Sequence, residues 1–142
     1  MKMLLAMAVI FSICLSFALQ QKDPWKVPEK YEKIKNPVTA DKASIKSGKE
    51  IYMNYCTGCH GINGKGAGAR SERLTTEPAD FTTAAFQNQS DGALLYKVYF
   101  GHHEMPGFKH VFPGHEGVSE NSFGETRVPG DLINYLRSYV KK

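Results

Sequence analysis

The stretch that decides the fold is YCTGCHG, residues 55–61. Two residues separate Cys56 from Cys59, and His60 follows the second cysteine directly. The 142 residues contain only one other cysteine, Cys14, which lies in the apolar start of the sequence. Two thiols and an imidazole are therefore concentrated at one place in a chain of single-domain length.

Three chemistries use a Cys-x-x-Cys-His motif. A thioredoxin-type redox pair is expected within a strand–helix–strand unit, and nothing in this sequence has the pattern of a strand ladder. A structural zinc site needs four ligands, and there is no second Cys-x-x-Cys or His-x-x-x-His pair. In the third chemistry, thiols about one helical turn apart add to the two vinyl groups of a haem, and the next histidine ligates its iron. The motif predicts one covalent haem c held by Cys56 and Cys59 and ligated by His60, with a disulfide or another metal site as the alternative.

The distribution of methionines predicts the second iron ligand. Three of the five lie in the first seven residues, and Met53 comes three residues before Cys56, on the wrong side to reach the opposite haem face. Met105, in the loop GHHEMPGF, remains, and its thioether is a soft ligand suited to haem iron. The alternatives are that Met105 only packs in the core, or that His102 or His103 ligates the iron and lowers its potential.

Ligation by both His60 and Met105 leaves the iron no open position for oxygen or peroxide. We therefore expect transfer of single electrons and no catalytic residue. A haem enzyme or gas sensor with a labile sixth ligand is the alternative from a different functional class.

The first 20 residues are typical of a signal peptide. After a positive start, residues 3–19 carry no formal charge, and the small residues Ser16 and Ala18 occupy positions that a signal peptidase prefers. We expect cleavage after Ala18 or Gln20 and export to the periplasm. The alternative is a retained anchor in the inner membrane, although a membrane span typically needs roughly 20 apolar residues.

The rest of the chain is mildly basic. Without Lys2, 17 of the 18 Lys and Arg remain against 14 Asp and Glu, with no clustered basic module that would favour nucleic-acid binding. Residues 21–40 contain three prolines and no clean periodicity, which predicts an extended arm. Trp25 and Tyr31 are expected to fix parts of this arm to the domain.

Apolar spacing after the arm predicts an all-α domain over residues 41–142. Helices are expected over about 41–56, 90–100 and 129–140. Gly48 interrupts the first helix at a cost of about 1 kcal/mol, so its presence there needs a structural reason. The expected caps are Asp41 or Ser44, then Ser90, and Gly101 as a helix stop.

These features together resemble the class I cytochromes c. Gly48 and Tyr52 lie eight and four residues before Cys56 and match the family's glycine and aromatic on the first helix. DLINYL, residues 131–136, is similar to the final-helix signature, with Tyr135 at its aromatic position. The resemblance implies that the first and last helices cross and that Gly48 lets the ring of Tyr135 approach.

The resemblance covers residues 41–142 and implies a cytochrome c fold, about three to four helices around one haem. Family proteins use a proline carbonyl to accept a hydrogen bond from the ligand histidine, which makes Pro78 the candidate. Tyr52 and Tyr99 are expected in the core with their hydroxyls at the surface, or alternatively beside the haem or a propionate.

Two segments are extra relative to compact family members: the arm, and about a dozen residues between Met105 and Asp131. For each segment, two interpretations stay open: it docks a partner, or it is a surface insertion without a function. With an exported leader, the resemblance implies an electron carrier between a quinol-oxidising complex and a terminal oxidase or reductase. The rival role is an electron-entry subunit of a larger membrane respiratory complex.

Overall fold

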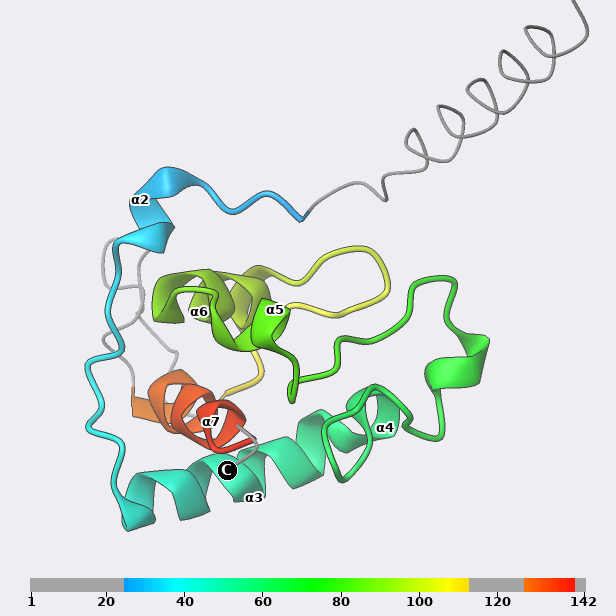
Figure 1. Ribbon diagram of the computed structural model, residues 1–142, viewed down its shortest axis with the longest axis horizontal. Coiled ribbons are helices and arrows are strands. Elements are labelled where there is room, and N and C mark those ends of the chain that lie inside the picture. The colour runs from blue at the N-terminus through cyan, green and yellow to red at the C-terminus, as the bar shows by residue number, and fades with distance from the viewer. Residues whose placement is uncertain (1–24, 113–126, 140–142) are drawn as a thin grey trace, which may run out of the picture.

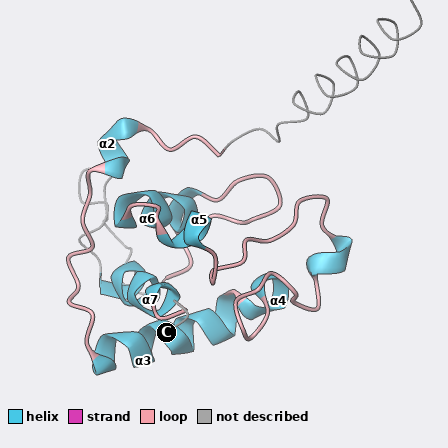
Figure 2. Cartoon of the chain, in the orientation of Figure 1, coloured by secondary structure: helices cyan, strands magenta, loops and turns pink. Residues whose placement is uncertain are grey.

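The computed structural model describes residues 25–112 and 127–139, and within these ranges every regular element is a helix. The leader and most of the expected loop insertion lie outside the described residues. Figure 2 shows helices joined by long loops, which confirms the all-α prediction for this part of the chain. In chain order the elements are α2 (Glu29–Glu32), α3 (Lys42–Tyr55), α4 (Thr57–His60), the 3-10 turn η1 (Ser71–Arg73), α5 (Ala84–Gln87), α6 (Asp91–Phe100) and α7 (Arg127–Arg137).

Helix α3 begins at the predicted cap. The Ser44 backbone N–H donates to Asp41 Oδ1 at 2.7 Å, which satisfies one of the amide groups left without a partner at a helix N-terminus. The helix buries Ser44, Gly48 and Tyr52 on one side. It ends directly before Cys56, so the Cys-x-x-Cys-His motif starts where α3 stops.

Helix α7 packs across α3 at Gly48. Figure 1 shows α7 nearly end-on while α3 runs across the view. A Cβ atom at Gly48 would lie 2.0 Å from the Asp131 carbonyl oxygen and 2.8 Å from Tyr135 Cβ. The expected close contact is therefore confirmed, but its nearest neighbour is the backbone of Asp131 rather than the ring of Tyr135.

Helix α7 differs from the prediction at both ends. It spans Arg127–Arg137 and so includes residues before Pro129, which is compatible with a place near a helix start because a missing N–H there breaks no intrahelical bond. Its last helical residue is Arg137 rather than Val140. Its apolar residues Leu132, Ile133 and Leu136 are buried.

Helix α6 matches its prediction. Ser90 Oγ accepts from the Ala93 N–H at 3.0 Å, and the positive φ of Gly101, 69°, ends the helix. Its buried face packs against α7 and α2. No helix in the described part of the chain is long and apolar enough to cross a membrane.

The described part of the arm, residues 25–40, is not wholly extended, because it contains α2. Tyr31 of α2 is buried, with its ring centroid 4.7 Å from that of Tyr96 and 5.7 Å from that of Phe100. Gly92 lets the arm approach closely, since a Cβ there would lie 1.9 Å from the Tyr31 carbonyl oxygen. The expectation that aromatic residues fix the arm to the domain is confirmed for Tyr31.

A buried amide network attaches the end of the arm to both α3 and α7. Asn36 Nδ2 donates to the Gly130 carbonyl at 2.9 Å and to Asn134 Oδ1 at 2.8 Å. Asn134 Nδ2 donates in turn to Ser44 Oγ at 2.8 Å and to the Val38 carbonyl at 3.0 Å. The arm therefore follows one side of the helices, as Figure 1 shows, and ends at their crossing.

Candidate haem site

The motif forms a helical turn directly after α3. The Cys59 and His60 N–H groups both donate to the Cys56 carbonyl, at 3.3 and 3.0 Å, so the two thiols and the imidazole come from one compact turn. Both cysteines are free and partly buried, and no disulfide joins them. Burial, with a smaller effect of Cys59, raises the pKa of the Cys56 thiol to about 12. A nucleophilic cysteine of the thioredoxin type has a lowered thiol pKa, and the shift at Cys56 is in the opposite direction.

His60 is held as a neutral base. Its Nδ1 lies 3.3 Å from the Ala79 carbonyl oxygen, which favours the tautomer with the proton on Nδ1 and the lone pair on Nε2. Burial lowers the pKa of His60, against a smaller opposing effect of the Ala79 carbonyl. A neutral imidazole is the form that ligates a metal.

The prediction that Pro78 accepts this hydrogen bond is wrong by one residue. A Cβ at Gly66 would lie 2.3 Å from the Pro78 carbonyl oxygen, so that carbonyl packs against the loop after the motif. The next carbonyl, that of Ala79, is the one within reach of His60. Spacing along the chain does not determine which of two adjacent carbonyls faces the ring, because successive peptide planes point in different directions.

The glycine-rich loop after the motif folds back over α4. The N–H groups of Gly66 and Gly68 donate to the carbonyls of His60 and Cys59, each at 3.0 Å. A Cβ at Gly68 would lie 2.4 Å from the Gly58 carbonyl oxygen, so only glycine permits this approach. The loop thereby satisfies carbonyl groups at the end of a very short helix.

Tyr52 is buried completely, and its hydroxyl donates to the Gly61 carbonyl at 2.5 Å. The expectation of a surface hydroxyl is therefore wrong for Tyr52. The bond adds a buried donor to a carbonyl at the C-terminus of α4, which also accepts from the Gly64 N–H at 3.2 Å. Burial raises the pKa of Tyr52, so its phenol stays protonated and keeps donating.

Two aromatic residues that no sequence pattern marks as site residues lie around His60 and the loop after it. The ring of Phe81 stacks on that of His60, with centroids 4.5 Å apart and an interplanar angle of 26°. The hydroxyl of Tyr139 donates to the Ile62 carbonyl at 3.0 Å. No local pattern marks either residue, since both contacts join segments far apart in sequence.

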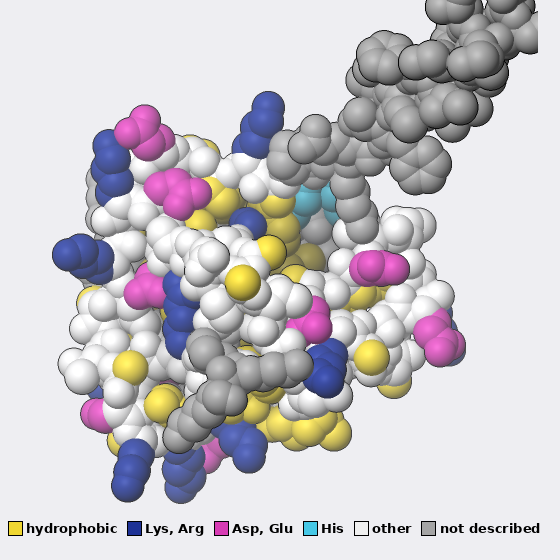
Figure 3. All heavy atoms as spheres, viewed as in Figure 1, with side chains coloured by type: hydrophobic (Ala, Val, Ile, Leu, Met, Phe, Trp, Pro, Cys, Tyr) yellow, Lys and Arg dark blue, Asp and Glu magenta, His cyan; other side chains and the backbone are white. Residues whose placement is uncertain are grey.

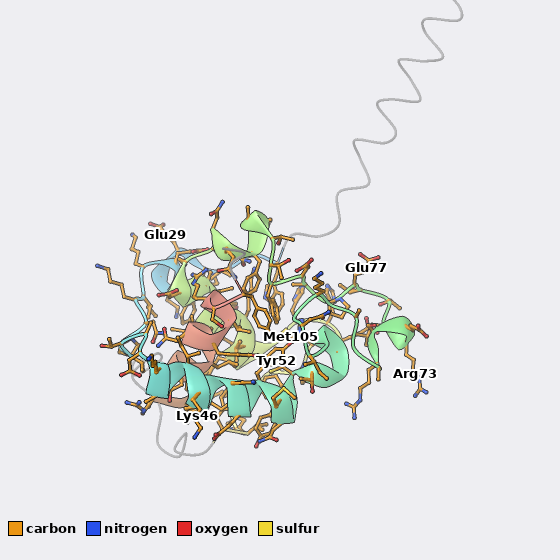
Figure 4. All side chains as sticks on the ribbon, turned by 60° about the horizontal axis from the view of Figure 1, so that its bottom comes forward. Glu29, Lys46, Tyr52, Arg73, Glu77 and Met105 are labelled. Carbon is orange, nitrogen blue, oxygen red and sulfur yellow. The ribbon has the colours of Figure 1, made fainter. Side chains whose placement is uncertain are left out.

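Met105 lies in a tight hairpin, residues 101–107, which we call the Met105 hairpin. The N–H and carbonyl groups of His102 and Met105 exchange two hydrogen bonds of 2.9 Å. Met105 is partly buried and packs against the hydrophobic core, and Figure 4 shows it over the middle of the molecule. In contrast, Met53 is exposed on α3.

Glu104 connects this hairpin to the loop that approaches His60. Its carboxylate accepts hydrogen bonds from Thr75 N and Thr75 Oγ1, each at 2.8 Å, and from Thr76 N at 3.0 Å. These bonds, that of the Thr75 side chain most strongly, lower the pKa of Glu104. Because Thr76 precedes Ala79 by three residues, the two loops that would cover opposite faces of a haem are joined.

The rival ligands differ in their surroundings. His103 is exposed at the turn of the Met105 hairpin, with a φ of 49°. His102 is partly buried, and its ring stacks on Trp25 with centroids 5.0 Å apart. Ligation of iron by Met105 rather than by His102 stays a prediction.

The donor set fits a haem c. The described residues contain two free thiols, a neutral imidazole on the same turn and a thioether on a second fixed loop. The same residues contain no group of three or more His, Cys, Asp or Glu side chains that could hold a metal ion without a porphyrin. The set is therefore matched to a haem rather than to zinc.

Comparison with known proteins identifies the family. Residues 43–116 match the family model described as cytochrome c oxidase, cbb3-type, subunit III. The chain is a c-type cytochrome of this family. The resemblance to class I cytochromes c is thereby confirmed, and a cytochrome c domain implies electron transfer by a haem.

One relative in sequence and one solved structure with a similar fold are both longer than this chain. Over 52 residues the cytochrome is 38% identical to quinohemoprotein alcohol dehydrogenase ADH IIB of Pseudomonas putida, a match that covers 34% of this chain and 8% of the dehydrogenase. The fold of this cytochrome is similar to that of a chain in the reducing HAO-like protein complex of Kuenenia stuttgartiensis, with a TM-score of 0.60 and 23% identity. That match covers 89% of this chain and 54% of the other, so the cytochrome spans about half of that chain and a small part of the dehydrogenase.

Proposed function

We propose that this cytochrome is a single-electron carrier of a respiratory chain, with one haem attached through Cys56 and Cys59. His60 and Met105 would ligate the iron from opposite faces. The observation that carries the proposal is the pairing of a neutral His60, oriented by the Ala79 carbonyl, with a thioether on a hydrogen-bonded hairpin. When bound, the haem supplies an iron that gains and loses one electron.

The protein's contribution is to keep both ligands in place while the charge changes. Phe81 covers one side of the His60 ring, and Glu104 fixes the Met105 hairpin. Ligation by histidine and methionine favours the reduced state relative to two histidines and raises the potential. Two occupied axial positions leave no site for a substrate, which supports a carrier rather than an enzyme.

Met105 is tested by optical spectroscopy of the oxidised holoprotein. A Met105→Ala variant is expected to lose the weak red absorption band of sulfur-to-iron charge transfer, and its reduced form is expected to bind carbon monoxide rapidly. Met53→Ala, which removes an exposed methionine on α3, is the matched control and should keep the parent spectrum. If the Met105→Ala spectrum equals that of the parent, the assignment of Met105 is refuted.

The absence of a substrate site is tested on the parent protein. Carbon monoxide added to the reduced cytochrome should change its spectrum slowly or not at all, because Met105 would occupy the sixth position. A rapid change would instead support the alternative of a haem enzyme or gas sensor with a labile ligand.

A second candidate function is that of an electron-entry subunit in a larger complex. It is supported by the name of the matching family, a subunit of an oxidase, and by the dehydrogenase, of which the match covers 8%. Size-exclusion chromatography of native fractions distinguishes the two functions. A free carrier elutes at its own mass, whereas a subunit elutes with other chains.

We also propose export to the periplasm through the leader of residues 1–20, with cleavage or with retention as an inner-membrane anchor. The mass of the mature protein, and its distribution between periplasmic and membrane fractions, test both variants. A mature chain that starts at Met1 in the cytoplasmic fraction would refute export.

The proposed partners are a quinol-oxidising complex as donor and a terminal oxidase or reductase as acceptor. Figure 3 shows Lys and Arg side chains alternating with Asp and Glu over one face of the molecule. Such mixed charge suits brief, salt-sensitive encounters. The rate of reduction by a quinol-oxidising complex, measured against ionic strength, tests this proposal, and an absence of reduction would contradict it.

A further inference from the structure

The Met105 hairpin presents a second side chain in the same direction as Met105. His102 and Met105 are directly opposite each other in an antiparallel bridge and exchange both backbone hydrogen bonds. Opposite residues of an antiparallel pair project their side chains to the same face. The side chains of His102 and Met105 therefore face the same group from one loop.

His102 carries a polar atom without a partner in the described part of the chain. Its Nε2 is buried and forms no hydrogen bond with any described group, either as donor or as acceptor. Buried polar side-chain atoms are nearly always paired in folded proteins, so this nitrogen indicates a ligand that completes the site.

The arm fixes the ring that carries this nitrogen. The ring planes of Trp25 and His102 are 23° apart, with centroids at 5.0 Å, and Lys97 Nζ lies 5.3 Å from the Trp25 ring centroid. A stacked imidazole keeps its ring nitrogens in a defined plane. The arm thus determines where Nε2 points, and Lys97 of α6 helps to hold Trp25.

We propose that His102 Nε2–H donates a hydrogen bond to a propionate carboxylate of the haem and that Trp25 positions the ring for this bond. The inference rests on the proposed function, because Met105 takes the iron and leaves the carboxylates as the haem's hydrogen-bond acceptors. His102 is then a positioning residue that stabilises a negative charge near the iron. An uncompensated propionate charge favours the oxidised iron; the donated N–H partly compensates this charge, so the bond raises the redox potential.

The test uses the oxidised and reduced holoprotein. His102→Phe keeps an aromatic ring against Trp25 and removes the N–H donor. We expect a lower midpoint potential, a shifted carboxylate band in the infrared difference spectrum between redox states, and an unchanged sulfur-to-iron band. His102→Gln retains an N–H donor and should restore most of the potential, and His110→Phe, at an exposed position outside the hairpin, should change neither measurement.

Trp25→Ala provides a second variant that keeps His102 itself. It should lower the potential in the same direction and by less than His102→Phe, because the donor is present but less well oriented. This variant keeps the inference testable if His102→Phe incorporates haem poorly.

Three results would overturn the inference. An unchanged potential and carboxylate band in His102→Phe would show that no propionate is bound there. Equal effects of the Phe and Gln variants would show that packing, not the donor, matters. Loss of axial ligation in His102→Phe would make His102 an iron ligand. The first two results leave the assignment of Met105 and the proposed function intact. The third result would put the assignment of Met105 in question, and the separate Met105→Ala spectrum decides that point.

Discussion

The hydroxyl of Tyr52 has one function that a phenylalanine would not supply. It is buried and donates to the carbonyl of Gly61, the residue directly after His60. The ring itself packs against Tyr135, with centroids 5.3 Å apart. At this position the aromatic ring stabilises the crossing of α3 and α7, and the hydroxyl stabilises the end of the haem motif.

Tyr52→Phe is expected to destabilise the holoprotein by about 1 kcal/mol, because a buried hydrogen bond is lost while the Gly61 carbonyl keeps the Gly64 N–H as its donor. Equilibrium unfolding by denaturant measures this change. Tyr55→Phe is the matched control, since Tyr55 is exposed and stacks edge-on against Phe108 through its ring. Equal stability of the two variants would contradict a structural role for the Tyr52 hydroxyl.

At the scale of the elements, the crossing of α3 and α7 depends on the absence of a side chain at Gly48. The Asp131 carbonyl would lie 2.0 Å from a Cβ there, and a helix backbone cannot move aside as a flexible side chain would. Gly48→Leu is therefore expected to lower the free energy of unfolding by at least about 1–3 kcal/mol and to reduce haem incorporation.

Thermal unfolding and the yield of holoprotein measure the effect of Gly48→Leu. Lys49→Leu adds the same side chain at the next, exposed position of α3 and should leave both close to the parent. If Gly48→Leu matured and melted like the parent, the helices would cross elsewhere.

The Met105 hairpin is a second element whose position depends on one residue. Glu104 accepts three hydrogen bonds from Thr75 and Thr76, in a loop that belongs to the opposite side of the site. Glu104→Ala is expected to loosen the hairpin, so that the reduced protein binds carbon monoxide several-fold faster than the parent. Stopped-flow spectroscopy measures this rate.

Glu77→Ala is the control for Glu104→Ala, since Glu77 is an exposed carboxylate in the loop that contains Thr75 and Thr76. Its rate of carbon monoxide binding should equal that of the parent. A Glu104→Ala rate equal to the control would mean that the hairpin holds Met105 without this connection.

At the scale of the whole molecule, the arm is part of the folded body. It buries Tyr31 against α6, contributes Asn36 to a network with α7, and places Trp25 on His102.

Tyr31→Ala should therefore lower the free energy of unfolding by about 3 kcal/mol or more, as expected for deletion of a buried aromatic side chain. Unfolding of the holoprotein measures it, with Lys35→Ala, at an exposed arm position, as control. An arm that acted only as a linker would give equal stability in both variants.

The local features of this cytochrome could be predicted from the sequence. The haem motif, the caps Asp41 and Ser90, and the stop at Gly101 depend on residues within one or two helical turns, so their spacing carries the information. The residues alone indicate that a glycine inside a helix needs a compensating reason, and the resemblance to class I cytochromes c made Gly48 a predicted close contact.

Contacts between distant segments depended on the tertiary structure. Only the fold determines that Ala79 rather than Pro78 faces His60, that the Tyr52 hydroxyl turns inward, and that Glu104 reaches Thr75. The contact of Trp25 with His102 joins residues 77 positions apart in the same way. The physical reason is that residue spacing determines direction along a helix, whereas loops of irregular φ and ψ place their carbonyls and side chains through packing against the rest of the chain.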